Sequence, residues 1–247
     1  MQEFRWKDSL RLVLPPLLVD IYRAVLIRSG YRAPLSALLK LPITPLEKIF
    51  PGIGQAEIQI PCSQLSRGPG ALPMTEYLFF SAICRYRQPL RVLEIGTFRG
   101  SSTLAMAVNS PDRTEVFTLD LDPSHKKPTK YPLNIGGLEN HPFAPGELFL
   151  QTPYARKIRQ LYGDSASFDF QPFYGTMDLV FIDGNHGYEN VRSDSEQAFR
   201  MLRPGGLILW DDYYDAFPSV VRCLNEIHAS RPLLHIERSR LVLYLSA

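Results

Sequence analysis

Carboxylate residues mark the ends of four apolar runs in this 247-residue chain. Glu94 interrupts Val-Leu-Glu-Ile-Gly and Asp120 ends Val-Phe-Thr-Leu-Asp. Asp183 follows Leu-Val-Phe-Ile, and the pair Asp211 and Asp212 follows Leu-Ile-Leu-Trp. If these runs are parallel strands, their carboxyl ends meet at one edge of a sheet, where ligands bind in open α/β folds. The pattern predicts an acidic site there, suited to hydroxyl groups, a cationic ligand or a metal ion.

A turn with two glycines follows the first run, with Gly96 and Gly100 before a helix that would begin at Ser101. A dinucleotide site normally has a third glycine and packs a pyrophosphate against the helix. The carboxylate of Glu94 would repel a pyrophosphate but attract the cationic side of S-adenosylmethionine. Asp120, twenty residues beyond the turn, lies where an acid binds ribose hydroxyls in Rossmann-type sites. The turn therefore favours a methyl donor over NAD.

Strands and helices alternate around these residues, which is typical of βαβ units with a mainly parallel sheet. Two runs, 179–182 and 207–210, are continuously apolar, as are strands buried on both faces. The fold class is therefore α/β: Rossmann-like and doubly wound, with helices on both faces and an antiparallel last strand. Strands are predicted at 90–95, 115–120, 158–162, 178–183, 206–211 and 241–246, and helices at 74–87, 101–109, 187–202 and 217–230.

Proline clusters outline the domain organisation. Residues 1–75 are predicted to form an α-rich, irregular N-terminal extension, followed by a domain over 76–247. Residues 123–153 carry several prolines and little periodicity directly after the ribose-binding acid. Such a segment is either a functional lid or a disordered tract. We therefore interpret 123–153 as an insertion or lid near the cofactor.

Charge and hydropathy limit the partners. A net charge of +2 argues against an extended nucleic-acid interface. The apolar stretch 10–19 is too short to span a membrane, and no cleavage pattern of a secretory signal follows it. An amphipathic helix predicted at 16–28 could rest on an anionic membrane or pack on the domain or a second subunit. Together with three widely spaced cysteines, this predicts a cytoplasmic protein, with peripheral inner-membrane contact and a homodimer as further options.

Four motifs in order resemble those of class I S-adenosylmethionine-dependent methyltransferases. They span 94–100, 118–123, 181–186 and 202–212, and the resemblance covers residues 76–247. The Ile-Asp-Gly-x-His run resembles a bacterial subgroup and, more distantly, catechol-type and sugar O-methyltransferases. The resemblance implies an enzyme with the methionine part of the cofactor at the glycine turn, ribose at the second motif and adenine near 164–165. The implied cofactor-binding residues are Glu94, Gly96, Thr97, Gly100, Ser101, Asp120, Leu121, Asp164, Ser165 and Asp183.

Methyl transfer requires alignment of the acceptor and removal of its proton. In catechol-type enzymes, acids after the fourth and fifth strands hold Mg²⁺, and Asp183, Asp211 and Asp212 match those positions, with Asp replacing Asn. His186 replaces a lysine of those enzymes. Because imidazole titrates near pH ~6.5, His186 is a candidate general base, with Asp183 as the second catalytic residue.

Three functions remain open from the sequence. The leading one is O-methylation of a small-molecule hydroxyl, on a sugar or natural-product intermediate, by His186, a divalent metal, or both. The second is metal-free methylation of nitrogen or a carboxylate. The third is a non-catalytic S-adenosylmethionine-binding module docked to a membrane or a partner.

Overall fold

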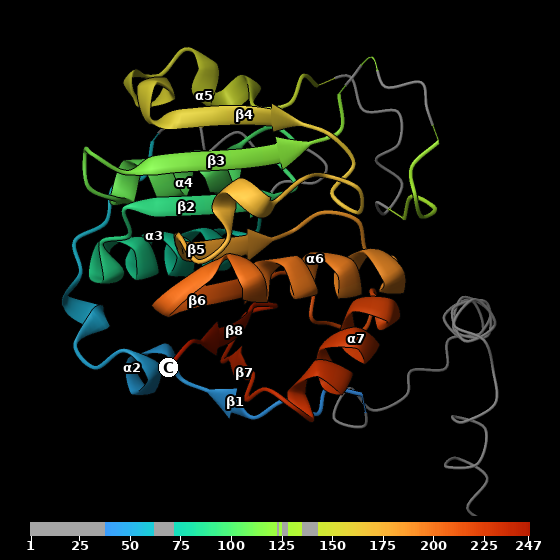
Figure 1. Cartoon of the computed structure of the whole chain (residues 1–247). Helices are drawn as coiled ribbons and strands as arrows, with labels where there is room; N and C mark the ends of the chain where they lie inside the picture. The colour runs from blue at the N-terminus through green and yellow to red at the C-terminus, as the bar shows by residue number, and fades with distance from the viewer. Residues whose placement is uncertain (1–37, 62–71, 123, 125–127, 135–142) are drawn as a thin grey trace, which may run out of the picture.

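Eight strands form one sheet in the computed structural model, which describes residues 38–61, 72–122, 124, 128–134 and 143–247 (Figure 1). The strand order is β1-β7-β8-β6-β5-β2-β3-β4, and β8 is the one antiparallel strand among those described. The predicted fold class is confirmed. The strands are β1 (Ile43–Thr44), β2 (Arg91–Ile95), β3 (Glu115–Asp120), β4 (Ile158–Tyr162), β5 (Met177–Ile182), β6 (Leu202–Trp210), β7 (Leu234–Ile236) and β8 (Val242–Leu245).

Helices cover both faces of this sheet. Helices α3 and α4 pack on one face, and α6 and α7 pack on the other, in front of the sheet in Figure 1. Shorter helical turns lie in the connections. The helices are α2 (Leu46–Ile49), α3 (Met74–Arg87), α4 (Ser101–Asn109), α5 (Glu147–Leu150), α6 (Tyr188–Met201) and α7 (Pro218–His228), with 3₁₀ turns at Ile53–Gln55, Pro153–Lys157 and Gln171–Phe173.

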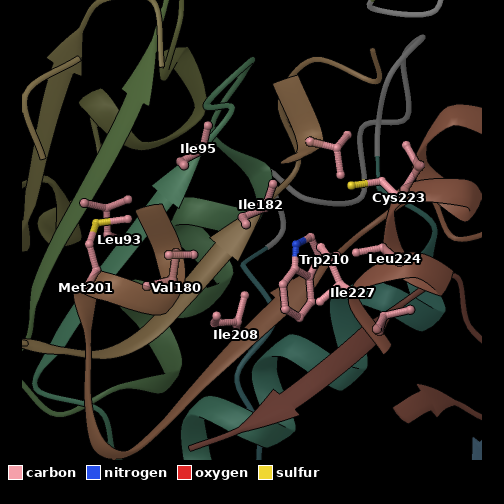
Figure 2. Close-up of a cluster of buried hydrophobic side chains, with 14 of the residues drawn as sticks. Leu93, Ile95, Val180, Ile182, Met201, Ile208, Trp210, Cys223, Leu224 and Ile227 are labelled. Carbon is pink, nitrogen blue, oxygen red and sulfur yellow. The ribbon is translucent and has the colours of Figure 1, made fainter. Parts of the chain in front are cut away.

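The central strands are buried on both faces, as their continuous apolar runs predict. Successive side chains of a strand point to opposite faces, so Val180 and Ile182 of β5 join the cluster under α6 and α7, shown in Figure 2. Leu179 and Phe181 join the cluster under α3 and α4. Two cores thus fix the strands in register, with their carboxyl ends at one edge.

The sequence did not predict the short strands β1 and β7, because two or three residues are too few to show a hydrophobic periodicity. Strand β1 of the N-terminal region pairs with β7, and β7 pairs with β8, so residues before 60 complete one edge of the sheet. The helix predicted at 16–28 lies outside the described residues. Cys84 and Cys223 are buried thiols, while Cys62 also lies outside them.

Among the described helices, none has the length and apolar character needed to cross a membrane.

Candidate functional site

A cavity of about 470 Å³ opens at the carboxyl ends of β2, β3, β5 and β6. This is within the range of about 300–1,000 Å³ typical of small-molecule and cofactor sites. The cavity lies between β2 and β5, where the strand order reverses: from β2 the chain continues to β3 on one side, and from β5 it continues to β6 on the other. Ligands usually bind at such a position in open α/β folds. Of the predicted residues, the cavity wall includes Gly96, Asp120, Leu121, Asp164, Ser165, Asp183, His186, Asp211 and Asp212.

The glycine turn after β2 forms one wall. Gly96 has φ +99°, and a Cβ atom there would lie 2.0 Å from the carbonyl oxygen of Asp183. Only glycine leaves room for this approach of two strand ends. Gly100, at φ +86°, ends the turn, and a Cβ there would lie 2.5 Å from the ring of Phe149. The turn therefore presents backbone rather than side chains to the cavity at Gly96.

Glu94 lies beneath this turn and not on the cavity wall. Its fully buried carboxylate accepts hydrogen bonds from the hydroxyls of Ser102, Thr103 and Thr118, the last at 2.6 Å. Burial raises the pKa of Glu94 to about 7, and the three hydroxyls oppose that rise. Partners on α4 and β3 thus hold the Glu94 carboxylate below the described cavity wall, and its predicted contact with the methionine part stays a prediction.

Three further residues of the predicted cofactor set are absent from the described cavity wall: Thr97, Gly100 and Ser101. The Thr97 hydroxyl is buried 2.6 Å from that of Thr118, and Gln160 donates to it at 3.0 Å. The Thr97 side chain therefore contacts β3 and β4 rather than the cavity.

Asp120 ends β3 on the cavity wall, as predicted. Its carboxylate accepts the backbone N–H of Phe98 at 2.7 Å and that of Leu121 at 2.7 Å. These two bonds orient the carboxylate on the cavity wall. The binding of ribose hydroxyls by Asp120 stays a prediction, which this position favours.

Asp183, His186 and Asp212 converge at the other end of the cavity. One ligand atom from each lies within 4.8 Å of the others. His186 Nε2 lies 2.8 Å from Asp212 Oδ2, and the imidazole packs 4.0 Å from the ring centre of Phe217. His186 Nδ1 is buried without a hydrogen-bond partner in the described part of the chain. A buried unpaired nitrogen is costly, so its place beside a cavity calls for an explanation by function or by a bound molecule.

Asp211 faces a different partner, Arg240, in the turn before β8. The guanidinium donates to Asp211 Oδ2 at 2.9 Å and lies 3.3 Å from Asp212 Oδ1. The backbone N–H of Arg240 is 3.0 Å from Glu76 of α3. Burial and the Asp212 charge raise the pKa of Asp211 to about 7, while Arg240 opposes the rise. Burial, followed by Asp211 and Asp212, raises the pKa of Asp183 well above its ordinary value.

These contacts redistribute the predicted metal ligands. The sequence grouped Asp183, Asp211 and Asp212, whereas the structure groups Asp183 and Asp212 with His186 and directs Asp211 to Arg240. Two carboxylates and an imidazole are donors that fit a divalent cation. Arg240 was missed because nothing in a single sequence places a residue of the last hairpin beside strand-end acids.

A family model described as a methyltransferase domain matches residues 93–213, which hold the cavity's glycine turn and strand-end acids. By this match the chain carries a methyltransferase domain over residues 93–213. A catechol O-methyltransferase of Niastella koreensis is 28% identical over 135 residues, covering 54% of each chain. Uncharacterized protein R132 of Acanthamoeba polyphaga mimivirus is 29% identical over 150 residues, covering 58% of this chain and 61% of that one.

The fold has solved counterparts. The O-methyltransferase TomG from Streptomyces achromogenes, in complex with S-adenosylmethionine, aligns with a TM-score of 0.56 at 17% identity, over 81% of this chain and 96% of that one. The curated relatives above are matched over only 54–61% of their own length. The comparisons therefore show a methyltransferase domain and its fold, and the chemistry of this chain follows from its own residues.

The loop after β4 supplies the wall beyond Asp120. Asp164 accepts the backbone N–H of Ala166 at 3.0 Å and that of Lys130 at 2.8 Å, and Ser165 lies beside it on the wall. Asp194 of α6 is fully buried next to this loop. Burial raises the pKa of Asp194 to about 7, the nearby Ser165 hydroxyl opposes that rise, and neither carboxylate oxygen has a hydrogen-bond partner among the described residues. Asp194 was not identified from the sequence, because an acid within a polar helix resembles a solvated one.

We expect Asp194→Asn to change how the stability of this protein depends on pH. An unfolded Asp titrates near pH ~3.9, so between pH ~4 and 7 the folded state binds more protons and wild-type stability falls as pH rises. Asn removes this loss, which is on the order of 2–4 kcal/mol. Urea unfolding at pH 5 and pH 8 tests this, with the exposed Asp169→Asn as control. Equal pH dependence in wild type and Asp194→Asn would contradict it.

Proposed function

We propose that this chain binds S-adenosylmethionine and transfers its methyl group to a hydroxyl of a small molecule, with His186 as the general base. One observation carries the proposal. The same cavity is lined by Asp120, suited to ribose hydroxyls, and by the His186–Asp212 pair, whose second ring nitrogen has no partner among the described residues.

The cavity residues fit this cofactor. The carboxylate of Asp120 would accept the ribose hydroxyls, Leu121 would pack on the adenine, and Asp164 and Ser165 would lie beyond it. The backbone approach at Gly96 leaves room for the methionine part, and Asp183 supplies a carboxyl group near the cationic centre. When bound, S-adenosylmethionine supplies a methyl group activated by its sulfonium.

The His186–Asp212 pair provides a base of defined orientation. With the Nε2 proton donated to Asp212, the hydrogen-bond network assigns the neutral tautomer that leaves Nδ1 as an acceptor. Nδ1 would take the proton of the acceptor hydroxyl as its oxygen attacks the methyl carbon, and Asp212 would stabilise the resulting imidazolium. The guanidinium of Arg240 lies beside Asp211 and Asp212, and its positive charge would stabilise the ionised form of these carboxylates.

A divalent cation is the second candidate for activating the acceptor. The convergence of Asp183, His186 and Asp212 favours it, and these three residues would hold the ion. The cation would lower the pKa of the acceptor hydroxyl, as metal ions do for bound water. His186 cannot be a metal ligand through Nε2 and keep its bond to Asp212, so the two chemistries are separable by experiment.

Calorimetric titration of S-adenosylmethionine, with and without Mg²⁺, tests the proposal. We expect Asp120→Ala to weaken binding by about one to two decades, since a charge-assisted hydrogen bond contributes about 1.5–3 kcal/mol. The neighbouring exposed Asp122→Ala serves as control. Absence of binding to the wild type would overturn the proposal.

An acceptor panel of catechol, sugar hydroxyls, amines and carboxylates then separates O-methylation from transfer to nitrogen or a carboxylate. Peripheral membrane contact and a homodimer stay predictions tied to residues 16–28, outside the described part, and the cytoplasmic location stays a prediction from the cysteines and the absence of a signal pattern. Sedimentation with anionic vesicles, compared with neutral ones, tests the membrane contact.

A further inference from the structure

Residues 128–134, here called the strap, form part of the cavity wall although they lie in the irregular segment. Thr129 and Leu133 of the strap line the cavity, and Leu133 is 43% exposed. A partly exposed leucine on a cavity wall indicates a cover rather than a core element. The strap crosses from the loop after β4 to the turn after β5, so it touches both ends of the site.

The side chain of Asn185 holds one end of the strap. Its Oδ1 accepts the backbone N–H of Asn134 at 3.2 Å, and its Nδ2 donates to the carbonyl of Pro132 at 3.2 Å. The same Oδ1 accepts the N–H of Gly187 at 2.8 Å. A side-chain amide is needed here, because these bonds require a donor and an acceptor together.

The adjacent catalytic turn is bonded to the strap as well. The backbone N–H of His186 donates to the carbonyl of Asn134 at 2.9 Å. At the other end, the N–H of Lys130 donates to Asp164 at 2.8 Å, and its Nζ donates to the carbonyl of Ala166 at 3.1 Å. The strap is thus tied to the proposed base and to the proposed adenine loop.

We propose that Asn185 is a positioning residue that clamps the strap over the cavity and thereby slows the exit of the ligand beneath it. The identity of that ligand, S-adenosylmethionine, rests on the proposed function. The clamp itself rests on the hydrogen bonds of Asn185. Ligand exit requires the strap to leave the cavity wall, so weakening its attachment raises the population of the open form.

Trypsin cleavage after Lys130 reports the opening of the strap without any ligand, because cleavage of a transiently opened segment follows the open population. Loss of two neutral hydrogen bonds in Asn185→Ala predicts cleavage at this site about tenfold faster than in wild type. Asn185→Asp keeps the acceptor and loses the donor, so we expect an intermediate rate. Asn134→Ala is the matched control, since the contacts of Asn134 to this turn use backbone atoms.

The dissociation rate of S-adenosylmethionine, measured by stopped flow on the same variants, tests the consequence. We expect it to rise about tenfold in Asn185→Ala, with Asn134→Ala unchanged. Equal cleavage rates in wild type and Asn185→Ala, with both proteins folded by circular dichroism, would overturn the clamp. Faster cleavage with an unchanged dissociation rate would overturn its link to ligand exit. Absence of cofactor binding to the wild type would instead overturn the proposed function. The cleavage rates would still test the clamp, because they are measured without a ligand.

Discussion

His186→Ala is expected to lower kcat for methyl transfer by about 10²–10⁴-fold, the usual contribution of a positioned general base. The dissociation constant of S-adenosylmethionine should change little, because Asp120 and the glycine turn lie at the other end of the cavity.

His186→Gln and Asp212→Asn sharpen this test. Glutamine fills space near Phe217 without a basic nitrogen, and should be as inactive as alanine. Asp212→Asn keeps the size of a residue held at φ +64°, while removing the charge that stabilises an imidazolium. It should lower kcat less than the loss of the ring. The measurements use a hydroxyl acceptor that the wild type methylates.

A kcat of His186→Ala close to that of wild type would exclude the base. Chelation is a separate test, which distinguishes the base from a metal ion. If a divalent cation at Asp183, His186 and Asp212 activates the acceptor, EDTA abolishes turnover and Mg²⁺ or Mn²⁺ restores it. Turnover that is insensitive to EDTA but lost in His186→Ala supports the base alone.

The regular part of the fold could be predicted because its signals are local. Strands β5 and β6 have apolar runs long enough to show burial on both faces, and the glycine turn fixes the change from β2 to α4. Strands β1 and β7 span two and three residues, and only their pairing with each other and β8 defines them. Such pairing is a long-range property.

The site could be predicted as a set of strand ends, but not as a set of contacts. Position along a strand places Glu94 near the site, yet three hydroxyls from α4 and β3 turn its carboxylate inside. Asp211 and Asp212 are adjacent, yet one bonds Arg240 through its Oδ2 and the other approaches His186. Asp212 has a left-handed backbone, which residue type alone does not reveal.

Arg240→Met is expected to destabilise the protein more than loss of any surface ion pair. The guanidinium is 26% exposed and pairs with Asp211 and Asp212, both largely buried, while its backbone is bonded to Glu76. Removing one partner of a buried ion pair leaves uncompensated charge and costs about 3–5 kcal/mol. For a chain of this size that corresponds to a Tm lower by roughly 6–20 °C.

The size of this loss should depend on pH. The pKa of Asp211 is raised to about 7, above its unfolded value, so below that pH the folded protein holds Asp211 neutral. Above it, ionised Asp211 and Asp212 lose their countercharge in Arg240→Met. The variant should therefore lose more stability at pH 8 than at pH 6 in urea unfolding. Arg192→Met, which breaks an exposed pair with Glu196, is the control and should cost below about 1 kcal/mol.

A second substitution identifies the cause. In Arg240→Met with Asp211→Asn, the uncompensated charge is reduced, and part of the lost stability should return at pH 8. If the double variant is no more stable than Arg240→Met, the loss comes from the contact of the guanidinium with Tyr214, whose ring centroid lies 5.1 Å from Cζ, rather than from the charge of Asp211. Stability equal to that of Arg192→Met would show that the last hairpin does not neutralise the acids of the site.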